Sequence, residues 1–174
     1  MFSRVWIDFL LLNNIIGMLI TVEVSFNQPK FHSDATWNSN ATTFADRNFL
    51  GSHWPCIFVN SNNSIYILNQ KIRTIHIWQN ETDLNPTKIV SNSISLQFSM
   101  FVTTNGDIYA DNGKNSCIDK WIVENETWIS VMNVSLQCYG LFIDIYENLY
   151  CSMAGNHRVD KKWSNGTTTI VAGT

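Results

Sequence analysis

An internal repeat with a period of about 42 residues limits the folds open to this chain more than any other feature. Each copy places a Phe in a short apolar run and a Tyr eight residues later, and successive copies are 43 and 41 residues apart. These pairs are Phe58 and Tyr66, Phe101 and Tyr109, and Phe142 and Tyr150. Repetition at such spacings indicates that one small structural unit is built three times and stacked on its copies.

Each repeat is predicted to form four antiparallel strands. Short runs of Ile, Val, Phe and Tyr alternate with clusters of Asn, Gly, Asp and Ser, a pattern typical of strands joined by hairpins. The first two strands contain the Phe and the Tyr. We expect the third strands at 74–78, 116–122 and 158–163, and the fourth at 87–90, 128–132 and 167–171. Four strands in this length are typical of one β-propeller blade, so the predicted fold is all-β with three blades.

The turn between the first two strands sets their register. In the second repeat Asn105-Gly106 predicts a two-residue type I′ turn, since both residues tolerate a positive φ. The corresponding turn of the third repeat is then centred on Tyr146-Glu147, which places Cys151 opposite Phe142. A bridge from Cys151 to Cys138 requires the chain before the third repeat to fold back.

The repeats divide the chain into five segments. Residues 1–25 are a signal peptide or membrane anchor, 26–53 an N-terminal segment, and 54–95, 96–136 and 137–174 the three blades. Residues 41–45 resemble a lone fourth strand, which in many propellers completes the last blade. Three blades and one strand do not close a ring, and open sheet edges invite pairing or aggregation. We therefore expect a truncated gene product, a sequence fragment, or a partner chain that supplies the remaining blades.

The N-terminus has the features of an export signal. Arg4 precedes a largely apolar stretch at 5–24, which Asp8 and two Asn residues interrupt. A membrane-spanning helix needs about 20 apolar residues with few polar breaks, whereas a cleaved signal needs a shorter apolar core after a positive charge. The sequence favours a signal helix cleaved near Ser25, and hence secretion, with a retained single-pass anchor as the alternative.

Two further features agree with an oxidising, extracellular compartment. Six sites match the N-glycosylation pattern Asn-x-Ser/Thr, namely Asn40, Asn62, Asn80, Asn125, Asn133 and Asn165. The four cysteines are even in number and form no CxxC pair, which disfavours a zinc site. Cys138 and Cys151 flank the first hairpin of the third repeat and are the preferred disulfide. Cys56 and Cys117 are a second candidate pair, and by sequence all three connectivities are open.

Composition excludes several classes of function. The 11 basic and 14 acidic side chains give a net charge of -3, so no general attraction to nucleic acid is expected. Aromatic residues make up 13% of the chain, which excludes an intrinsically disordered protein. His32, His53 and His76 share no metal-ligand spacing. Four Asp residues recur at turns and strand ends, where Asp bonds its own backbone: Asp107, Asp111, Asp144 and Asp160. We expect no cofactor, with calcium or zinc as the alternative.

The third repeat carries a distinctive set of residues. They are Gly140-Leu141-Phe142-Ile143-Asp144, Asn148-Leu149-Tyr150 and Gly155-Asn156-His157-Arg158-Val159. Together these resemble an NHL repeat, which is named for its Asn-His-Leu-type motif. The second repeat retains Asn105-Gly106-Asp107-Ile108-Tyr109, whereas the first has Lys71-Ile72-Arg73 in place of the motif. The resemblance covers roughly 54–174 and implies a β-propeller, often six-bladed, in which Asn156, His157, Arg158 and Val159 have a structural role.

Two functions are consistent with these observations. The first is an extracellular binding module for a protein or glycan, because propellers present loops around a channel and the sequence contains no Gly-x-Ser-x-Gly elbow or P-loop. The alternative is part of an extracellular propeller enzyme, a lyase or lactone hydrolase with a metal in its channel. The resemblance implies this alternative, since some NHL-type propellers are lyases acting on peptidyl-hydroxyglycine. A membrane is expected as a partner only if the N-terminal segment is retained.

Overall fold

The structure of this chain, a computed structural model, consists of three four-stranded antiparallel sheets. It describes residues 33–34, 36, 43–46, 50, 56–69, 71–79, 85–91, 99–113 and 115–173. The signal or anchor helix predicted at 1–25 lies outside these residues. Within the described ranges, no helix has the length and apolar character needed to cross a membrane.

Each sheet uses four strands in sequence order, so each lies within one predicted repeat. The first sheet contains β1 (Cys56–Val59), β2 (Ile65–Asn69), β3 (Thr74–Trp78) and β4 (Lys88–Ser91). The second contains β5 (Met100–Val102), β6 (Ile108–Asn112), β7 (Cys117–Ile122) and β8 (Thr127–Asn133). The third contains β9 (Gly140–Ile143), β10 (Leu149–Met153), β11 (Arg158–Lys162) and β12 (Thr168–Gly173), with the 3-10 turn η1 (Ala154–Asn156) before β11. The predicted all-β fold of four-stranded blades is confirmed.

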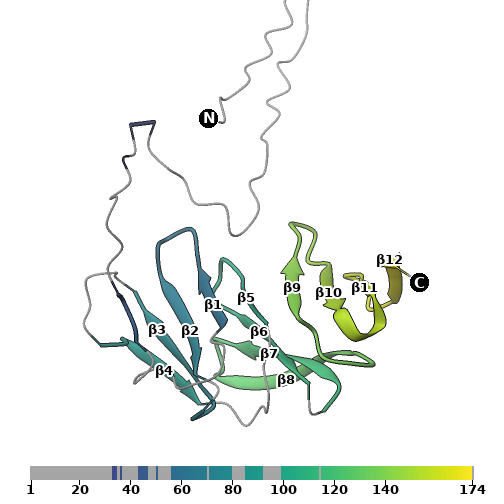
Figure 1. Cartoon of the computed structure of the whole chain (residues 1–174), viewed down its shortest axis with the longest axis horizontal. Helices are drawn as coiled ribbons and strands as arrows, with labels where there is room; N and C mark the ends of the chain where they lie inside the picture. Colours follow the sequence, from purple (N-terminus) through teal and green to yellow (C-terminus); the bar gives the residue numbers. More distant parts are fainter. Residues whose placement is uncertain are drawn as a thin grey trace, which may run out of the picture.

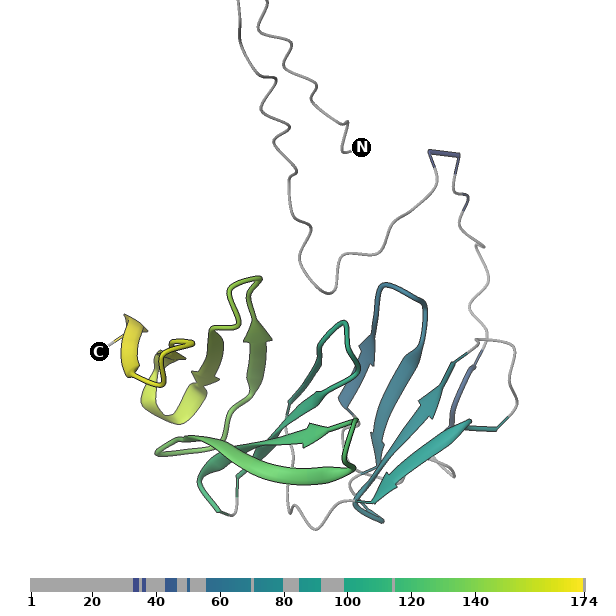
Figure 2. The ribbon, with the colours of Figure 1, turned by 180° about the vertical axis from the view of Figure 1, so that it is seen from behind.

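The three sheets stand side by side in chain order (Figures 1 and 2). Their first strands β1, β5 and β9 are next to one another, with contacts from β1 to β5 and from β5 to β9. The fourth strands lie at the outside, and the hairpins β1–β2, β5–β6 and β9–β10 point to the same end of the molecule (Figure 1). This arrangement of twisted four-stranded sheets is that of β-propeller blades.

The first hairpins of the second and third sheets have longer turns than the sequence predicts, and all three first hairpins turn in the same way. Each turn contains one residue with a positive φ, and these are Asn63 (60°), Gly106 (91°) and Glu147 (62°). Asn105 is not among them, so the Asn105-Gly106 turn is not type I′. A turn that closes through one left-handed residue adds a residue to the loop. The register therefore shifts by one, and Phe142 faces Tyr150 while Cys151 faces Leu141.

The segment before the first sheet differs from the lone strand predicted at 41–45. Its described residues, 43–45, form coil and bend rather than strand. Phe44 packs edge-to-face against the buried ring of Trp78 in β3, with the ring centroids 5.2 Å apart. An aromatic pair of this geometry gains contact without strand hydrogen bonds. Phe44 therefore adds to the apolar contacts of the first sheet without extending it.

The core lies between neighbouring sheets. Residues that lie opposite one another on antiparallel strands have their side chains on the same face of the sheet. We call the face that carries the paired Phe and Tyr the Phe face. The opposite face of the same sheet is the rear face. In the first sheet Phe58 is 8% exposed on the Phe face while Ile57 is 61% exposed on the rear face. In the third sheet the exposure is reversed, since Ile143 on the rear face is buried and Phe142 is 39% exposed. The Phe faces of the first and second sheets therefore pack against the rear faces of the second and third sheets.

Candidate functional site

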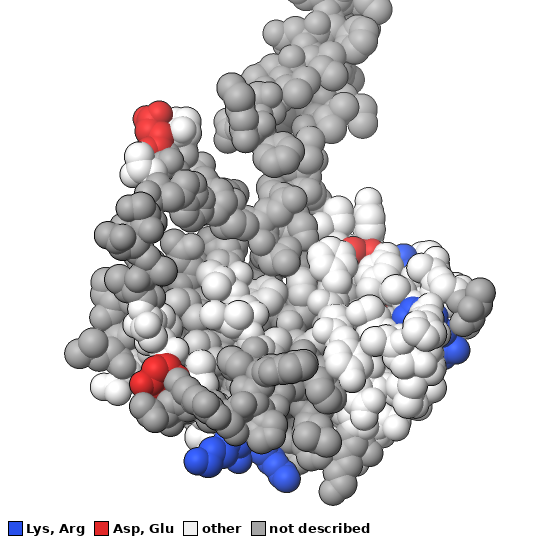
Figure 3. Space-filling view, in the orientation of Figure 1, with Lys and Arg blue, Asp and Glu red and all other residues white. Residues whose placement is uncertain are grey.

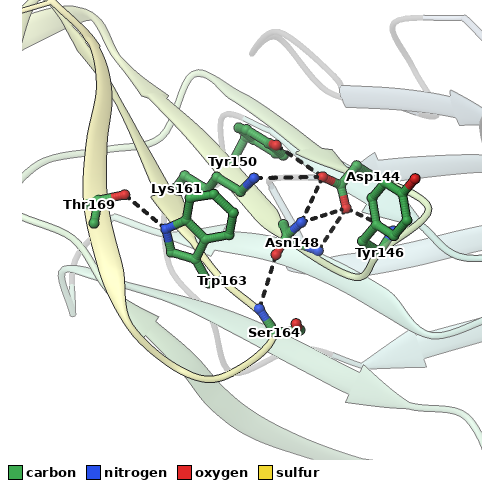
Figure 4. Close-up of polar contacts among 8 residues, drawn as sticks. All are labelled: Asp144, Tyr146, Asn148, Tyr150, Lys161, Trp163, Ser164 and Thr169. Carbon is green, nitrogen blue, oxygen red and sulfur yellow. Dashed lines mark hydrogen bonds and ion pairs between the residues drawn. The ribbon is translucent and has the colours of Figure 1, made fainter.

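Asp144 is the centre of a polar cluster at the tip of the β9–β10 hairpin (Figure 4). Its Oδ1 accepts hydrogen bonds from the backbone N–H groups of Tyr146 and Asn148, both at 2.9 Å. Its Oδ2 accepts from the Asn148 amide and from the Tyr150 hydroxyl, each also at 2.9 Å. An Asp side chain that bonds the backbone of its own turn holds the turn in one shape. The tip of this hairpin is therefore preorganised.

Lys161 of β11 extends this cluster across the Phe face of the third sheet (Figure 4). Its ammonium lies 4.0 Å from Asp144 Oδ2 and 3.5 Å from the centroid of the Trp163 ring. The Tyr150 ring is 4.9 Å away, and the Trp163 indole N–H donates to Thr169 Oγ1 at 3.0 Å. Aromatic faces attract a cation when water is excluded. The buried Lys161 side chain thus has a carboxylate and two rings as partners.

The second sheet repeats this construction. The Lys120 ammonium lies 2.8 Å from Asp107 Oδ2 and 5.3 Å from the centroid of the Tyr109 ring. Asp107 Oδ1 accepts the Val123 backbone N–H at 3.0 Å, which joins the first hairpin to the β7–β8 turn. In the third sheet Asn148 Oδ1 accepts the Ser164 N–H at 3.1 Å in the corresponding place. These polar contacts are therefore part of the repeated blade.

The two carboxylates of these clusters are stabilised in their charged form. Burial raises the pKa of Asp144, but the hydrogen bonds from Asn148 and Tyr150 lower it by more, so the pKa lies below its ordinary value. Burial likewise raises the pKa of Asp107, and the contacts from Lys120 and Val123 bring it below its ordinary value. Both groups are ionised at neutral pH and act as hydrogen-bond acceptors, not as general acids.

The three first hairpins expose Asn and Tyr side chains at one end of the molecule. We call Asn62, Asn105 and Tyr146 the hairpin tips; Asn62 and Asn105 are exposed, and Tyr146 is 73% exposed. Asn60 bonds the Asn62 and Ser64 backbone N–H groups at 3.0 and 2.8 Å. The first hairpin is therefore held by its own side chain, as the third is by Asp144.

The residues of the NHL-type motif lie at the β10–β11 turn, at the other end of the third sheet. His157 has a φ of 52° and donates its backbone N–H to the Ala154 carbonyl at 3.2 Å. Asn156 and Arg158 both reach Ser135 Oγ, at 2.6 and 3.4 Å. The half-buried Val159 pairs with Ser152 across β10. These contacts join the turn to the segment that leads into β9.

A shallow groove of about 450 Å³ lies beside this turn. Its lining includes Tyr139, Met153, His157 and Gly173. Gly173 has a φ of +84°, and a Cβ there would collide with the His157 carbonyl oxygen. Because only glycine fits both the space and the backbone angle, β12 closes tightly on the β10–β11 turn.

The predicted disulfide between Cys138 and Cys151 is present, with the Cα atoms 5.5 Å apart. The Tyr139 backbone N–H donates to the Ser152 carbonyl at 2.9 Å, so the chain before β9 already runs beside β10. Cys138 N–H also donates to Asp111 Oδ1 of the second sheet at 3.0 Å. The fold-back that the bridge requires is therefore an extension of the β9–β10 pairing.

The second predicted bridge is wrong, because Cys56 and Cys117 are both free thiols. Cys56 begins the first strand of one sheet, whereas Cys117 begins the third strand of the next. Strands lie about 4.8 Å apart, so two strand spacings exceed the Cα separation of about 7 Å that a disulfide tolerates. Burial raises the pKa of Cys56 to about 11, an effect that a backbone hydrogen bond from Met100 only partly offsets.

Four of the six glycosylation sequons fall on described residues, and all four are exposed: Asn62, Asn125, Asn133 and Asn165. Asn125 and Asn165 occupy the equivalent β7–β8 and β11–β12 turns. Asn125 Oδ1 accepts the Thr127 hydroxyl at 2.6 Å, and Asn165 Oδ1 accepts the Thr167 hydroxyl at 2.8 Å. Asn40 and Asn80 lie outside the described residues.

Among the described residues, no group of three or more His, Cys, Asp or Glu side chains is placed to hold a metal ion. Asp160 pairs with Arg158, whose guanidinium donates to Asp160 Oδ2 at 3.1 Å. His76 is buried in β3, and burial lowers its pKa. His32 and His53 lie outside the described residues. On the side of the molecule drawn in Figure 3, the described Lys, Arg, Asp and Glu side chains lie in small separate groups.

Comparison with known proteins places this geometry among β-propeller-like folds, although no family model and no curated protein matches the sequence. Virginiamycin B lyase from Staphylococcus aureus aligns at 15% identity and a TM-score of 0.51, over 67% of this chain and 40% of that chain. A catalytically inactive variant of that enzyme with quinupristin aligns at 15% identity and a TM-score of 0.50, over the same shares. A streptogramin B lyase aligns at 13% identity and a TM-score of 0.52, over 67% and 39%. The chain spans about two fifths of the length of these lyases, and the likeness shows the fold alone.

Sequence reasoning located Asp107 and Asp144 as turn residues but missed the lysines that accompany them. The signal was present, because Lys120 and Lys161 are 41 residues apart, the same spacing as the Phe residues of their repeats. The stacking of Lys161 on Trp163 is not repeated in the second sheet, where Ile122 stands 41 residues before Trp163. Only the structure shows this contact.

Proposed function

We propose that this chain is an extracellular binding module of the NHL-type β-propeller class, which binds a protein or glycan through its hairpin tips. The observation that carries the proposal is the alignment of three hairpins at one end of the molecule (Figure 1), with the tips of the first and third held by Asn60 and Asp144. Preorganised loops lose little conformational entropy on binding, so more of the contact energy appears as affinity.

The chemistry of the hairpin tips supports this role. Tyr supplies a large amphipathic contact surface at low entropy cost, and Asn supplies adaptable hydrogen bonds; both are enriched in protein binding loops. The tips contribute two exposed Asn side chains and Tyr146, whose ring is 73% exposed. A sugar ring or an extended peptide offers matching apolar faces and hydroxyl or amide groups.

An extracellular location is the second part of the proposal. The Cys138–Cys151 disulfide and the exposed sequons are compatible with passage through an oxidising secretory pathway. In this proposal residues 1–25 direct export, glycans are attached at Asn125, Asn133 and Asn165, and the Asn62 amide is left to contact the ligand.

The test uses the secreted chain, fluorescently labelled, on an array of mammalian and microbial glycans and on a panel of extracellular proteins. Tyr146→Ala is expected to reduce binding at least about tenfold, as expected for loss of a buried Tyr contact. Tyr139→Ala is the matched control, because Tyr139 is 51% exposed but immediately precedes β9, at the end of that strand opposite the hairpin tip. Equal effects of the two substitutions, or no binding to either array, contradict the proposal.

A second candidate function is part of a propeller lyase, and the observation that favours it is the likeness to streptogramin B lyases. The described residues provide no group of three metal ligands, so no step through a metal is derived for them. Incubation of the chain with quinupristin, with and without added divalent cations, tests this directly by liquid chromatography. A change in quinupristin elution that depends on active protein supports the lyase, and unchanged quinupristin argues against it.

A further inference from the structure

The outer strands β8 and β12 are edge strands. Among the described residues, each pairs with a neighbouring strand on one side only, because each is the last strand of its four-stranded sheet. The outward edge of such a strand presents backbone N–H and C=O groups that pair readily with a strand of another chain. Soluble proteins therefore protect their edge strands, and the kind of protection can be read from the residues.

The sequences of these two strands lack charged protection. Proteins commonly protect an edge with Lys or another charged side chain, with Pro, or with a bulge. Neither Thr127–Asn133 nor Thr168–Gly173 contains a charged residue or a Pro. Ile129 of β8 is 44% exposed, and Ile170 and Val171 of β12 are 51% and 47% exposed. An uncharged edge with exposed β-branched side chains favours association.

Each of the two strands has a bulge, but the bulge protects one end only. The register of β8 against β7, and that of β12 against β11, shifts after the second residue pair counted from the end of the strand. A bulge bends an edge and interrupts its regular pairing. The stretches that precede the bulges, 127–130 and 168–170, are regular, and neither a bulge nor a charge protects them.

A glycosylation sequon stands next to each of these regular stretches. Asn125 lies two residues before β8 and Asn165 three residues before β12, and both are exposed. A strand residue adds about 3.4 Å, so no residue of 127–130 or 168–170 lies more than about 17 Å along the chain from its sequon. An attached glycan is bulky and hydrated, and at either site it is close enough to cover the neighbouring edge.

The first sheet provides a comparison within the same chain. Its outer strand β4 has Lys88 at the position that Ile129 occupies in β8 and Thr169 in β12. The Lys88 side chain is 40% exposed and lies 2.9 Å from Glu126. Pairing of another strand with this edge would desolvate the Lys, so the charge opposes association. The first sheet thus has a charge at the position where the other two have an uncharged residue near a sequon.

We propose that glycans at Asn125 and Asn165 prevent β8 and β12 from pairing with the outer strands of a second copy of this chain. The inference rests on the glycosylation included in the proposed function, and it adds a role for two of the sites. Without these glycans, the uncharged outer strand of one copy extends the sheet of another by strand addition. Ligand binding at the hairpin tips does not depend on this role.

The test trims the glycans from protein that has already folded. The chain is secreted with high-mannose glycans, and an endoglycosidase then shortens each glycan to one N-acetylglucosamine under native conditions. Circular dichroism checks that the fold is retained, and light scattering with thioflavin T fluorescence follows association at tens of micromolar. The trimmed protein is expected to form β-rich aggregates at least about tenfold faster than the untrimmed protein.

A charge placed on the outer strands is expected to replace the glycans. The trimmed double variant Ile129→Lys, Ile170→Lys is expected to aggregate no faster than the untrimmed wild type, because Lys on an edge opposes pairing. Both residues are exposed, so the core is not altered. Ile72→Lys is the matched control, since Ile72 is 55% exposed but lies in the β2–β3 turn, and after trimming it is expected to aggregate as fast as the wild type.

The possible results separate this role from the proposed function. Absence of glycans at Asn125 and Asn165, shown by peptide mass spectrometry of the secreted protein, overturns both this role and the glycosylation in the proposed function. If the glycans are present but trimming leaves the aggregation rate unchanged, this role alone is overturned. Aggregation that the Ile129→Lys, Ile170→Lys pair does not slow, or that Ile72→Lys slows equally, overturns the assignment to the outer strands.

Discussion

Replacement of Asp144 by Ala is expected to destabilise the third blade strongly, although the residue lies in a surface turn. The carboxylate accepts hydrogen bonds from two backbone N–H groups, from the Asn148 amide and from the Tyr150 hydroxyl, and it lies 4.0 Å from the Lys161 ammonium. A hydrogen bond to a charged group contributes about 1.5–3 kcal/mol, but water replaces part of this at a side chain that is 19% exposed. We expect a loss of about 2–3 kcal/mol in the free energy of unfolding, or about 10 °C in Tm.

Urea denaturation followed by tryptophan fluorescence measures this loss. Asp144→Asn retains the shape and one acceptor oxygen, so its loss is expected to be about half as large. Glu147→Gln is the control, because it removes a carboxylate from the same turn at an exposed position. It is expected to change the free energy of unfolding by less than about 0.5 kcal/mol.

The pH dependence of this difference follows from the direction of the pKa shift. The pKa of Asp144 in the folded protein lies below its ordinary value of 3.8, because the hydrogen bonds outweigh the effect of burial. The stabilisation is therefore complete above the unfolded pKa and is lost as the pH falls through the folded pKa. The stability gap between wild type and Asp144→Ala is expected to stay constant from pH 7 to about pH 5 and to shrink below about pH 4. A gap no larger than that of Glu147→Gln, or one that is unchanged at pH 3, refutes the reasoning.

Three further predictions concern the cysteines and the sequons. Replacing Cys138 and Cys151 by Ala is expected to lower the free energy of unfolding, measured by urea denaturation, by about 3 kcal/mol, because the bridge closes a loop with a sequence separation of 13. A wild-type stability that does not change when a reductant is added contradicts this. The Cys56 thiol, with a pKa of about 11, is expected to react with iodoacetamide at pH 8 about a hundredfold more slowly than free cysteine, as measured by pulsed alkylation and mass spectrometry. In protein secreted from eukaryotic cells, Asn125→Gln and Asn165→Gln are each expected to remove the mass of one glycan, and an unchanged mass shows that the site is not used.

Much of the strand order could be predicted because its signals are local. The alternation of apolar and turn residues depends on neighbours along the chain, and β3 runs over 74–78 as predicted. The predicted register was wrong by one position, because Phe101 pairs with Tyr109 in the structure, whereas a two-residue turn at Asn105-Gly106 would pair Phe101 with Ala110. The turn between them was predicted one residue too short, because the sequence Asn-Gly permits more than one turn type.

The sequence by itself determined the period, the four strands of each repeat and the preferred disulfide of this protein. The tertiary structure decided the features that depend on distance through space: Cys56 and Cys117 lie on different strands of different sheets, and Lys161 is enclosed by Trp163. It also decided which faces are open, because Phe58, Phe101 and Phe142 are equivalent in sequence yet differ in exposure. The physical reason is that the burial of a residue depends on which sheets lie on either side of its own sheet. The sequence of a single repeat does not specify those neighbours.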